Sequence, residues 1–475
     1  MKEQQKSRCL LCSLGCGFVI ETQFDEAVNL EYDLDNPVNR GALCSRGNYI
    51  LELINHSGRL IEPQVGGKPR GWNDTLDMIA GKMARYVGTR SAGLILEGDA
   101  STEDIITAQF FAEKCLGNDR IAVNFSTGDD SVYRTLASMS IPTSSIQPEE
   151  IESSEYILAV GDPFEIGPVV AGRVLRAKYA RRTNALTVIS GTPNRTSRFA
   201  TTHLAGSERK TLAQMLRVLA DQPECAGCSW LNVVKESQPS PADTEITSAV
   251  RAFLEKPSSV MILETQDPVT AGLAGAFVAA SGKDKGLLYI STYGNVGGIC
   301  EVCEGRDTVE SMIDSAEHGE LKVLIVLGAD MISSVPGRDV KSALGKLEFL
   351  VAGAPFENET TGTADPVLPT ALWVESEGTY NGSLLNPVVG PPGGALSYGE
   401  ILRRLTSKMG VTLPAVSSEP VLEHRELTGE DVKVLMQKSD EEAFIPAVRT
   451  TTIKYADGSL TDNMSWIKLQ GRKAW

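Results

Sequence analysis

The stretch EYILAVGDPFEIGPVVAGRVLRAKYARRTNALTVISGTPNRTSRFATTHL, residues 155–204, indicates the fold most directly. It holds two short apolar runs, 156–160 and 186–189, with a longer segment of helical periodicity between them. Gly161 and Asp162 follow the first run directly and indicate the turn that ends a strand. The order strand, helix, strand is typical of a parallel sheet covered by helices on both faces.

The same pattern recurs along the chain. Four further apolar runs, each bounded by glycine, aspartate or proline, alternate with helical segments: 260–263, 287–290, 323–327 and 349–351. The sequence therefore predicts an α/β fold with doubly wound parallel sheets. Gly328, Ala329 and Asp330 follow a strand as Gly161 does, at the sheet edge where open α/β folds bind ligands.

Composition excludes several classes of function. The chain has 475 residues, with 61 acidic against 45 basic side chains and a net charge of −16. That balance argues against binding nucleic acid or an anionic membrane through the overall field. No apolar run reaches the roughly 18–20 residues that a membrane span needs. The first residues show no export signal, so we expect a cytoplasmic protein.

Cysteine is where the sequence is unusual, because eight of the nine cysteines lie in groups with short spacings. Cys9, Cys12, Cys16 and Cys44 follow the pattern C-x2-C-x3-C-x27-C. A loop with three thiolates and a distant fourth thiolate is typical of a [4Fe–4S] cluster. Zinc and structural thiols are the alternatives. We predict a [4Fe–4S] cluster because soft thiolates suit it and the group contains no histidine.

The second cysteine group consists of two C-x2-C pairs, Cys225 with Cys228 and Cys300 with Cys303. Four thiolates of this kind suit a second iron–sulfur cluster or tetrahedral zinc, and we expect the pairs to meet in one site. Two separate reduced pairs are the alternative. Cys115 lies in an apolar helical segment, and we expect it in the core.

The first cysteine group, followed by NRGALCSRG at 39–47, resembles the molybdopterin oxidoreductase superfamily. Formate dehydrogenase large subunits and the large peripheral iron–sulfur subunit of respiratory complex I are the most similar branches. Further blocks resemble the family in the same order: GWNDTLDMIAGKM at 71–83, the stretch 155–204, LKVLIVLGADMISSVP at 321–336 and ENETTGTADPVLPTALWVESEGTYN at 357–381.

The resemblance implies a domain organisation. Residues 1–60 would form a small [4Fe–4S] domain. Residues 61–135 with 305–410 would form one doubly wound α/β domain. Residues 136–304 would form a second one that carries the second cysteine group. Residues 411–475 would be a C-terminal extension or docking tail, which makes the chain truncated before the family's C-terminal pterin-binding domain.

The chain departs from the catalytic members of the family at the metal ligand. An ungapped count across 117–136 places Gly128 where those members carry the cysteine or selenocysteine that ligates molybdenum or tungsten, and Asp129 where a histidine follows. Asp129, Asp130 or Ser131 could supply an oxygen ligand instead. We favour an acidic loop that caps a helix, with aspartate or serine at the cap. We therefore expect no bound molybdopterin and assign no catalytic residue.

Arg46 stands two places after Cys44, where catalytic relatives often carry a lysine between cluster and pterin. A guanidinium there would raise the reduction potential of the cluster, or it could simply pair with a surface carboxylate. We interpret Arg46 as cofactor-binding. Glu375 and Glu377 could face a pterin-like pocket, although solvated acids are the expected case.

Together these features predict an iron–sulfur electron-transfer subunit of a multisubunit redox complex. Its partners would be subunits that handle flavin, NAD(P) or ferredoxin in a hetero-oligomer, without nucleic acid or a membrane span. The tail WIKLQGRKAW at 466–475 could dock such partners. Two alternatives stay open: a catalytic formate dehydrogenase-like subunit with molybdenum or tungsten on a non-cysteine ligand, and a structural scaffold subunit.

Overall fold

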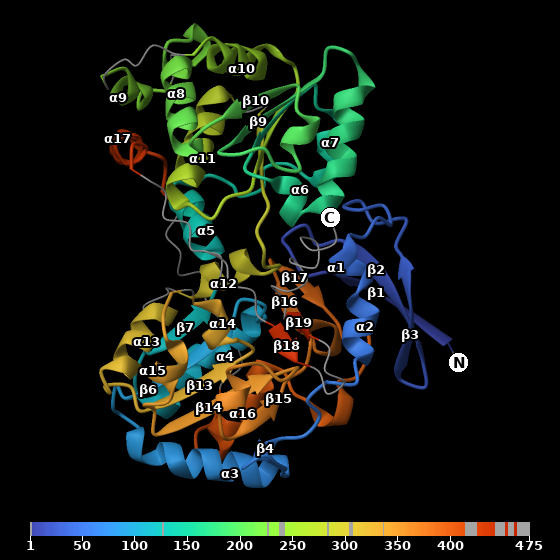
Figure 1. The fold of residues 1–475 in the computed structure, drawn as a ribbon, viewed down its shortest axis with the longest axis vertical. Helices are drawn as coiled ribbons and strands as arrows, with labels where there is room; N and C mark the ends of the chain where they lie inside the picture. The colour runs from blue at the N-terminus through green and yellow to red at the C-terminus, as the bar shows by residue number, and fades with distance from the viewer. Residues whose placement is uncertain are drawn as a thin grey trace.

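The apolar runs of the sequence become strands of two parallel sheets, one in each of two lobes (Figure 1). The computed structural model describes residues 2–125, 128–225, 228–236, 243–282, 285–303, 307–335, 337–413, 425–441, 452–454 and 460–462. The proposed docking tail at 466–475 lies outside the described residues. All six runs predicted as strands are strands, so the α/β prediction is confirmed.

The upper lobe in Figure 1 holds a five-stranded parallel sheet of strand order β10-β9-β8-β11-β12. Its strands are β8 (Tyr156–Val160), β9 (Ala185–Ser190), β10 (Thr202–Ala205), β11 (Ser259–Leu263) and β12 (Gly286–Tyr289). The helices around it are α5 (Asp129–Ser138), α6 (Pro163–Ile166), α7 (Pro168–Ala180), α8 (Glu208–Ala220), α9 (Leu231–Glu236), α10 (Thr244–Glu255), α11 (Pro268–Ser281) and α17 (Gly429–Lys438). The winding direction reverses between β8 and β11, which makes this pair the switch point of the sheet.

The lower lobe holds a seven-stranded sheet of order β5-β4-β15-β14-β13-β6-β7, parallel except for the short β4 and β5. Its strands are β4 (Gln64–Val65), β5 (Lys68–Pro69), β6 (Ala92–Glu97), β7 (Ile121–Asn124), β13 (Val323–Leu327), β14 (Phe349–Ala354) and β15 (Val367–Pro369). Its helices are α3 (Trp72–Met83), α4 (Thr102–Phe111), α13 (Val309–Glu317), α14 (Met331–Ser334), α15 (Val340–Leu344) and α16 (Tyr398–Lys408). This sheet takes strands from both sides of the upper lobe in sequence, and its switch point is β6 with β13.

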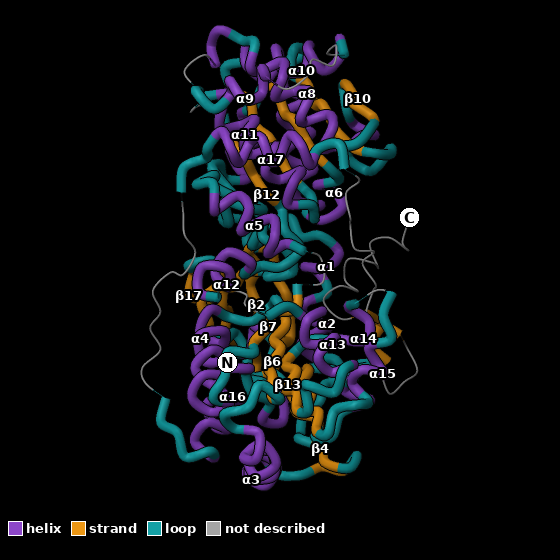
Figure 2. Tube along the Cα trace, turned by 90° about the vertical axis from the view of Figure 1, so that its left-hand side faces the viewer, coloured by secondary structure: helices purple, strands orange, loops and turns teal. Residues whose placement is uncertain are grey.

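The N-terminal segment forms a small antiparallel sheet of β1 (Lys2–Arg8), β2 (Gly17–Gln23) and β3 (Glu26–Tyr32). Two short helices follow, α1 (Ser45–Asn48) and α2 (Ile50–Asn55). Two small hairpins complete the described elements: β16 (Gly378–Tyr380) with β17 (Ser383–Leu385), and β18 (Thr452–Lys454) with β19 (Leu460–Asp462). Helix α12 (Val296–Val302) lies where the lobes meet, and the side view of the molecule shows the same two-lobed outline (Figure 2).

The hydrophobic core explains why the N-terminal domain lies against the upper lobe. Alternate residues of each strand point to opposite faces of the sheet. Ile157 and Ala159 of β8 pack in one continuous core with Phe18 and Ile20 of β2, whereas Leu158 packs with α8 and α11 on the other face. The upper sheet thus holds the cysteine domain and α7 on one face.

No helix in the described part of the chain is long and apolar enough to cross a bilayer.

Candidate metal centre

The loop that carries the first three cysteines is closed by its own backbone. The amide of Cys9 donates to the carbonyl of Cys16 over 2.8 Å, so both ends of the loop lie side by side where β1 meets β2. Gly15 has a φ of +66°, a left-handed conformation that favours glycine. A Cβ at Gly15 would also lie 2.9 Å from Nη2 of Arg8. Glycine therefore lets the chain turn back and present Cys16.

The fourth cysteine is brought to this loop by Asn39, which is 4% exposed. The Asn39 side chain accepts from the Gly17 amide and donates to the Gly17 carbonyl, both over 2.9 Å. Its Nδ2 also donates to the carbonyl of Ala42 over 2.9 Å. The segment that leads to Cys44 is thereby fixed against the loop that carries Cys16.

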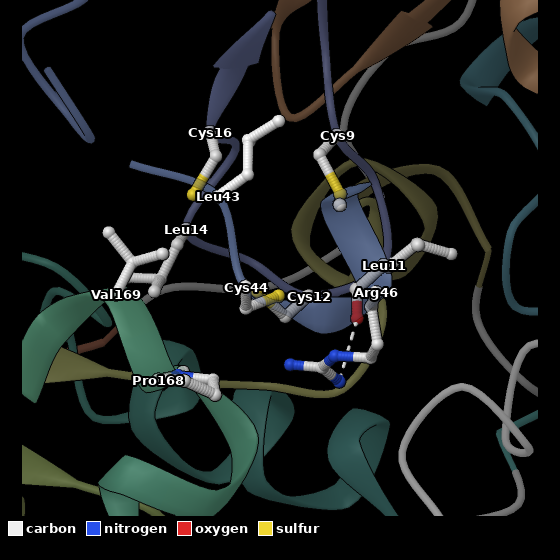
Figure 3. A pocket seen from close by; sticks show the side chains of 12 residues that line it. Cys9, Leu11, Cys12, Leu14, Cys16, Leu43, Cys44, Arg46, Pro168 and Val169 are labelled. Carbon is white, nitrogen blue, oxygen red and sulfur yellow. Dashed lines mark hydrogen bonds between the residues drawn. The ribbon is translucent and has the colours of Figure 1, made fainter. Parts of the chain in front are cut away.

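The four thiols line one small cavity (Figure 3). Cys9, Cys12 and Cys16 are buried, and Cys44 is partly exposed. The rest of the lining is mainly apolar and comes from the loop, α1 and the start of α7: Leu11, Leu14, Leu43, Arg46, Gly47, Gly167, Pro168 and Val169. These side chains exclude water from the cavity on most sides, and Cys44 marks its more open side.

The electrostatics of the cavity favour a bound cationic centre. Burial raises the pKa of the Cys9 and Cys16 thiols, and the neighbouring sulfurs of Cys12 and Cys44 raise both pKa values further. Thiolates gathered in an apolar cavity therefore need positive charge beside them. Iron ions would provide that charge, so the donor set fits a [4Fe–4S] cluster.

A single ion and a cluster place different demands on the four thiols. Among the described residues, no group of three or more Cys, His, Asp or Glu side chains is arranged to hold one metal ion. Tetrahedral zinc needs four ligands that converge on one point. In a [4Fe–4S] cluster, by contrast, each of the four thiolates binds a different iron.

Of the described side chains that line the cavity, Arg46 alone carries a permanent charge, and it is 3% exposed. Its guanidinium donates to the carbonyl oxygens of Leu11, over 3.2 Å, and of Ile166. Burial works to lower the pKa of Arg46, but the sulfurs of Cys12 and Cys44 outweigh it and raise that pKa. Arg46 is thus a buried cation beside the thiols, and its described hydrogen bonds go to backbone carbonyls rather than to a surface carboxylate.

The second cysteine group is not brought together. Cys225 is buried in the core between α8, α9 and α11, and Cys228 is packed against the same core. Cys300 and Cys303 lie at α12, where Cys300 packs with Tyr293. Figure 1 shows α9 at the far end of the upper lobe and α12 at the junction of the lobes. This placement argues against the predicted site shared by both pairs.

Cys115 is 1% exposed and packs in the core of the lower lobe, as predicted.

The position expected for a molybdenum or tungsten ligand is a tight turn. Gly128 precedes α5 with a φ of +73°, and a Cβ there would lie 3.3 Å from the carbonyl oxygen of Gln266. A side chain at this position would therefore be strained. Among the described residues no side chain caps α5, so the predicted Asp or Ser cap is wrong and Gly128 holds the cap position instead.

Asp129, the next residue, is 1% exposed and is held by hydrogen bonds from the end of β12. Its Oδ1 accepts from the Tyr289 hydroxyl over 2.8 Å. Its Oδ2 accepts from the Thr292 amide over 2.8 Å and also from the Thr292 hydroxyl. Both carboxylate oxygens thus take part in a buried network that joins α5 to β12.

The switch point of the upper sheet is filled by Glu264, which follows β11. Its Oε2 accepts from the Asp162 amide over 2.9 Å. A Cβ on Gly161, whose φ is +78°, would lie 2.1 Å from the Glu264 carbonyl oxygen and 2.7 Å from Oε2. Burial raises the pKa of Glu264 to about 7, and the carboxylates of Glu208 and Asp162 contribute in the same direction.

The switch point of the lower sheet is filled by aromatic rings. Gly328 follows β13 with a φ of +86°, and a Cβ there would lie 2.1 Å from the Tyr398 hydroxyl. Gly98 follows β6, and a Cβ there would lie 2.7 Å from the Phe125 ring. Phe125 in turn packs edge-on against Tyr293, with ring centroids 5.6 Å apart. At both sheet edges, side chains of the chain itself thus lie directly against the glycines that follow the strands.

Glu375 is buried rather than solvated, which corrects the expected case. It forms a two-pronged ion pair with Arg59, with N–O distances of 2.6 Å and 2.7 Å. Arg59 lies at the end of the cysteine domain, so the pair fastens that domain to the segment before β16. Nearby, the Trp373 ring nitrogen donates to the carbonyl of Arg8, next to Cys9, over 3.0 Å.

Comparison with family models gives two matches. Residues 3–56 match the molybdopterin oxidoreductase Fe4S4 domain, and residues 265–408 match the molybdopterin oxidoreductase domain. The first match contains all four cysteines of the cavity.

Three relatives illustrate the range of similar proteins. The F420-dependent formate dehydrogenase subunit alpha of Methanocaldococcus jannaschii is 26% identical over 85% of this chain and 70% of its own length. The NADPH-Fe(3+) oxidoreductase subunit alpha of Geobacter sulfurreducens is 23% identical over 87% of this chain and 57% of its own length. A nitrate reductase of Symbiobacterium thermophilum is 24% identical over 85% of this chain and 66% of its own length.

Among solved structures, acetylene hydratase from Pelobacter acetylenicus matches with a TM-score of 0.66 and 14% identity. The match covers 86% of this chain and 69% of the hydratase, and it supports the fold alone. The cysteine loop, the two interleaved sheets and the family matches agree: residues 3–56 are a molybdopterin oxidoreductase Fe4S4 domain, and residues 265–408 belong to a molybdopterin oxidoreductase domain.

Proposed function

We propose that the chain is an iron–sulfur electron-transfer subunit that has kept the [4Fe–4S] site of its family without a catalytic molybdenum or tungsten site. Cys9, Cys12, Cys16 and Cys44 would hold the cluster. When bound, a [4Fe–4S] cluster supplies a one-electron redox couple. Two of the relatives described above, from Methanocaldococcus jannaschii and Geobacter sulfurreducens, are alpha subunits by their names, which supports a role within a larger complex.

The chain's own residues account for such a role. Leu11, Leu14 and Val169 exclude water from the cavity. The buried guanidinium of Arg46 places a fixed positive charge beside the thiols. Because reduction adds a negative charge, that cation stabilises the reduced state more than the oxidised state. The residues thus hold the cluster in an environment that favours acceptance of an electron.

The turn at Gly128 is the main support for the proposed absence of a catalytic molybdenum or tungsten site. The expected ligand position has no side chain, and a Cβ there would be strained and close to the Gln266 carbonyl. Asp129, the obvious oxygen ligand, has both carboxylate oxygens engaged by Tyr289 and Thr292. Neither residue offers an uncommitted ligand to a metal.

The residues at the switch points do not fit a pterin dinucleotide. At the upper sheet its phosphates would meet the carboxylate of Asp162 and, above about pH 7, that of Glu264, where like charges repel. At the lower sheet, the rings of Tyr398 and Phe125 fill the space beside Gly328 and Gly98. We therefore assign no chemical step to a pterin or to a metal bound by one.

The match of residues 265–408 to the molybdopterin oxidoreductase domain favours one alternative, a catalytic subunit that acts on formate or a similar small molecule. Redox spectroscopy on the anaerobically purified chain separates the possibilities. Our proposal expects dithionite to produce the paramagnetic resonance signal of one reduced [4Fe–4S] cluster, with no reduction by formate. A molybdenum or tungsten signal with formate-driven reduction would contradict it. A cluster that no donor reduces would instead support the structural role.

A further inference from the structure

One long segment of this acidic chain contains no acid. Residues 166–207 hold seven arginines and lysines and no aspartate or glutamate, although acids outnumber bases by 61 to 45 in the whole chain. The segment includes α7, β9 and β10, which Figure 1 shows in the upper lobe, with α7 above the cysteine domain.

Many of these cations are exposed to solvent. The side chains of Arg176 and Arg181 are 64% and 69% exposed, and Arg182 and Arg198 are also exposed. Lys178 donates from Nζ to the carbonyl of Phe199, which joins α7 to the segment that carries Arg198. The segment of Arg198 and Phe199 therefore lies beside the surface of α7.

This surface extends onto the cysteine domain through Arg40. Arg40 and Arg176 both pair with Glu152, at 3.1 Å and 2.8 Å, and Arg173 pairs with the same carboxylate at 3.1 Å. Arg40 lies four residues before Cys44 in sequence. At the other end, Pro168 and Val169 of α7 line the cysteine cavity itself.

The nearby acids do not neutralise the surface. Glu152 is shared by three arginines, and Glu155 is shared by Arg181 and Lys256. Five cations thus share two carboxylates, and Arg182 and Arg198 add further positive charge. Glu149 and Glu150 lie in the same segment as Glu152. They reduce the excess of positive charge on the surface without removing it.

Two exposed aromatic side chains lie among these charges. Tyr179 is 68% exposed, and Phe199 is 40% exposed. Interfaces are enriched in arginine and in aromatic anchors of this kind. We call the surface formed by the following residues the basic patch: Arg40, Arg176, Lys178, Tyr179, Arg181, Arg182, Arg198 and Phe199.

We propose that the basic patch docks an acidic electron-carrier protein of the ferredoxin type, which exchanges single electrons with a cluster in the cysteine cavity at the N-terminal end of α7. This inference rests on the proposed function. A carrier with an acidic surface is repelled by most of a chain of net charge −16 and is attracted to the patch, so the field selects the orientation. The net charge of −16 also disfavours RNA, because its phosphate backbone would extend beyond the patch and meet the acidic remainder of the chain.

Stopped-flow reduction tests the docking. The probe is a purified acidic [4Fe–4S] ferredoxin, reduced before mixing with the intact chain. Variant R181E/R182E reverses two charges in the patch. Its matched control is K341E/K346E, which reverses two exposed lysines at α15 in the lower lobe. We expect the patch variant to be reduced at least about tenfold more slowly at low salt, and the control within about twofold of the unaltered chain. Added salt should slow the unaltered chain more than the patch variant.

Dithionite provides the second readout, because it needs no docking surface. If it reduces the cluster equally in all three proteins, the cluster is intact and a slower ferredoxin reaction reports docking. Equal ferredoxin rates in all three proteins would overturn the docking proposal. A patch that binds an RNA oligonucleotide while ferredoxin fails to reduce the unaltered chain would also overturn it. Failure of dithionite to reduce the unaltered chain would instead count against the proposed function.

Discussion

The hydroxyl of Tyr289, at the end of β12, donates a 2.8 Å hydrogen bond to Oδ1 of Asp129, the first residue of α5. This contact joins two segments 160 positions apart in the sequence. Through this hydrogen bond Asp129 has a structural role, at the position where a catalytic relative would handle substrate.

Replacement of Asp129 tests that role. D129A leaves the Tyr289 hydroxyl and the Thr292 amide without their acceptor, so we expect a loss of about 2–4 kcal/mol in unfolding free energy. Iron content should not change. Thermal unfolding with iron analysis checks both, and S131A at an exposed position is the control. Loss of a bound metal with little loss of stability would show that Asp129 is a ligand.

Cysteine substitutions test the single-cluster arrangement. We expect C12S to lose most of its iron, because a [4Fe–4S] cluster needs all four thiolates. The paired variants C225S/C228S and C300S/C303S should keep the iron of the unaltered chain. Circular dichroism confirms that each protein is folded. Iron loss in either paired variant would support the predicted second cluster instead.

Arg46 should set the reduction potential. R46M removes a buried cation beside the thiols and should lower the midpoint potential by on the order of 60 mV, a tenfold change in a one-electron equilibrium. R46K keeps the charge and should recover most of the shift, although it loses the forked contacts to Leu11 and Ile166. Spectroscopic titration measures the potentials. An unchanged potential in R46M would leave Arg46 a purely structural role.

Glu264 should make stability depend on pH. Its pKa is raised from 4.5 to about 7, so the folded chain holds this proton more tightly than the unfolded chain does. The stabilisation is complete below about pH 4.5 and is lost as the pH rises through about 7. E264Q has no such proton, so its stability relative to the unaltered chain should rise between roughly pH 5.5 and 8 by about 1–2 kcal/mol.

Melting temperatures of E264Q and the unaltered chain at about pH 5.5 and about pH 8 measure this change in relative stability. Variant E377Q, at an exposed glutamate, controls for the loss of one carboxylate. A difference between E264Q and the unaltered chain that does not change with pH would mean that the two states bind this proton equally.

The local pattern of apolar residues was enough to predict much of the fold. The apolar runs at 156–160 and 323–327 are buried on both faces, and such strands keep a continuous apolar signature that needs no knowledge of their neighbours. Spacing also sufficed to group Cys9, Cys12 and Cys16, because their loop closes on itself.

Contacts between distant segments could not be predicted in the same way. The pairs at Cys225 and Cys300 look alike in sequence, and only the course of the chain between them decides that they belong to different cores. The predicted solvated Glu375 is buried because Arg59, 316 positions away, neutralises it. The cap of α5 was missed because left-handed Gly128 leaves Asp129 free to bond across to β12.

Metal quantification on the intact, anaerobically purified chain distinguishes an electron-transfer subunit from a molybdenum or tungsten enzyme. We expect about four iron atoms per chain, with molybdenum and tungsten only at trace level. One molybdenum or tungsten per chain would contradict this expectation.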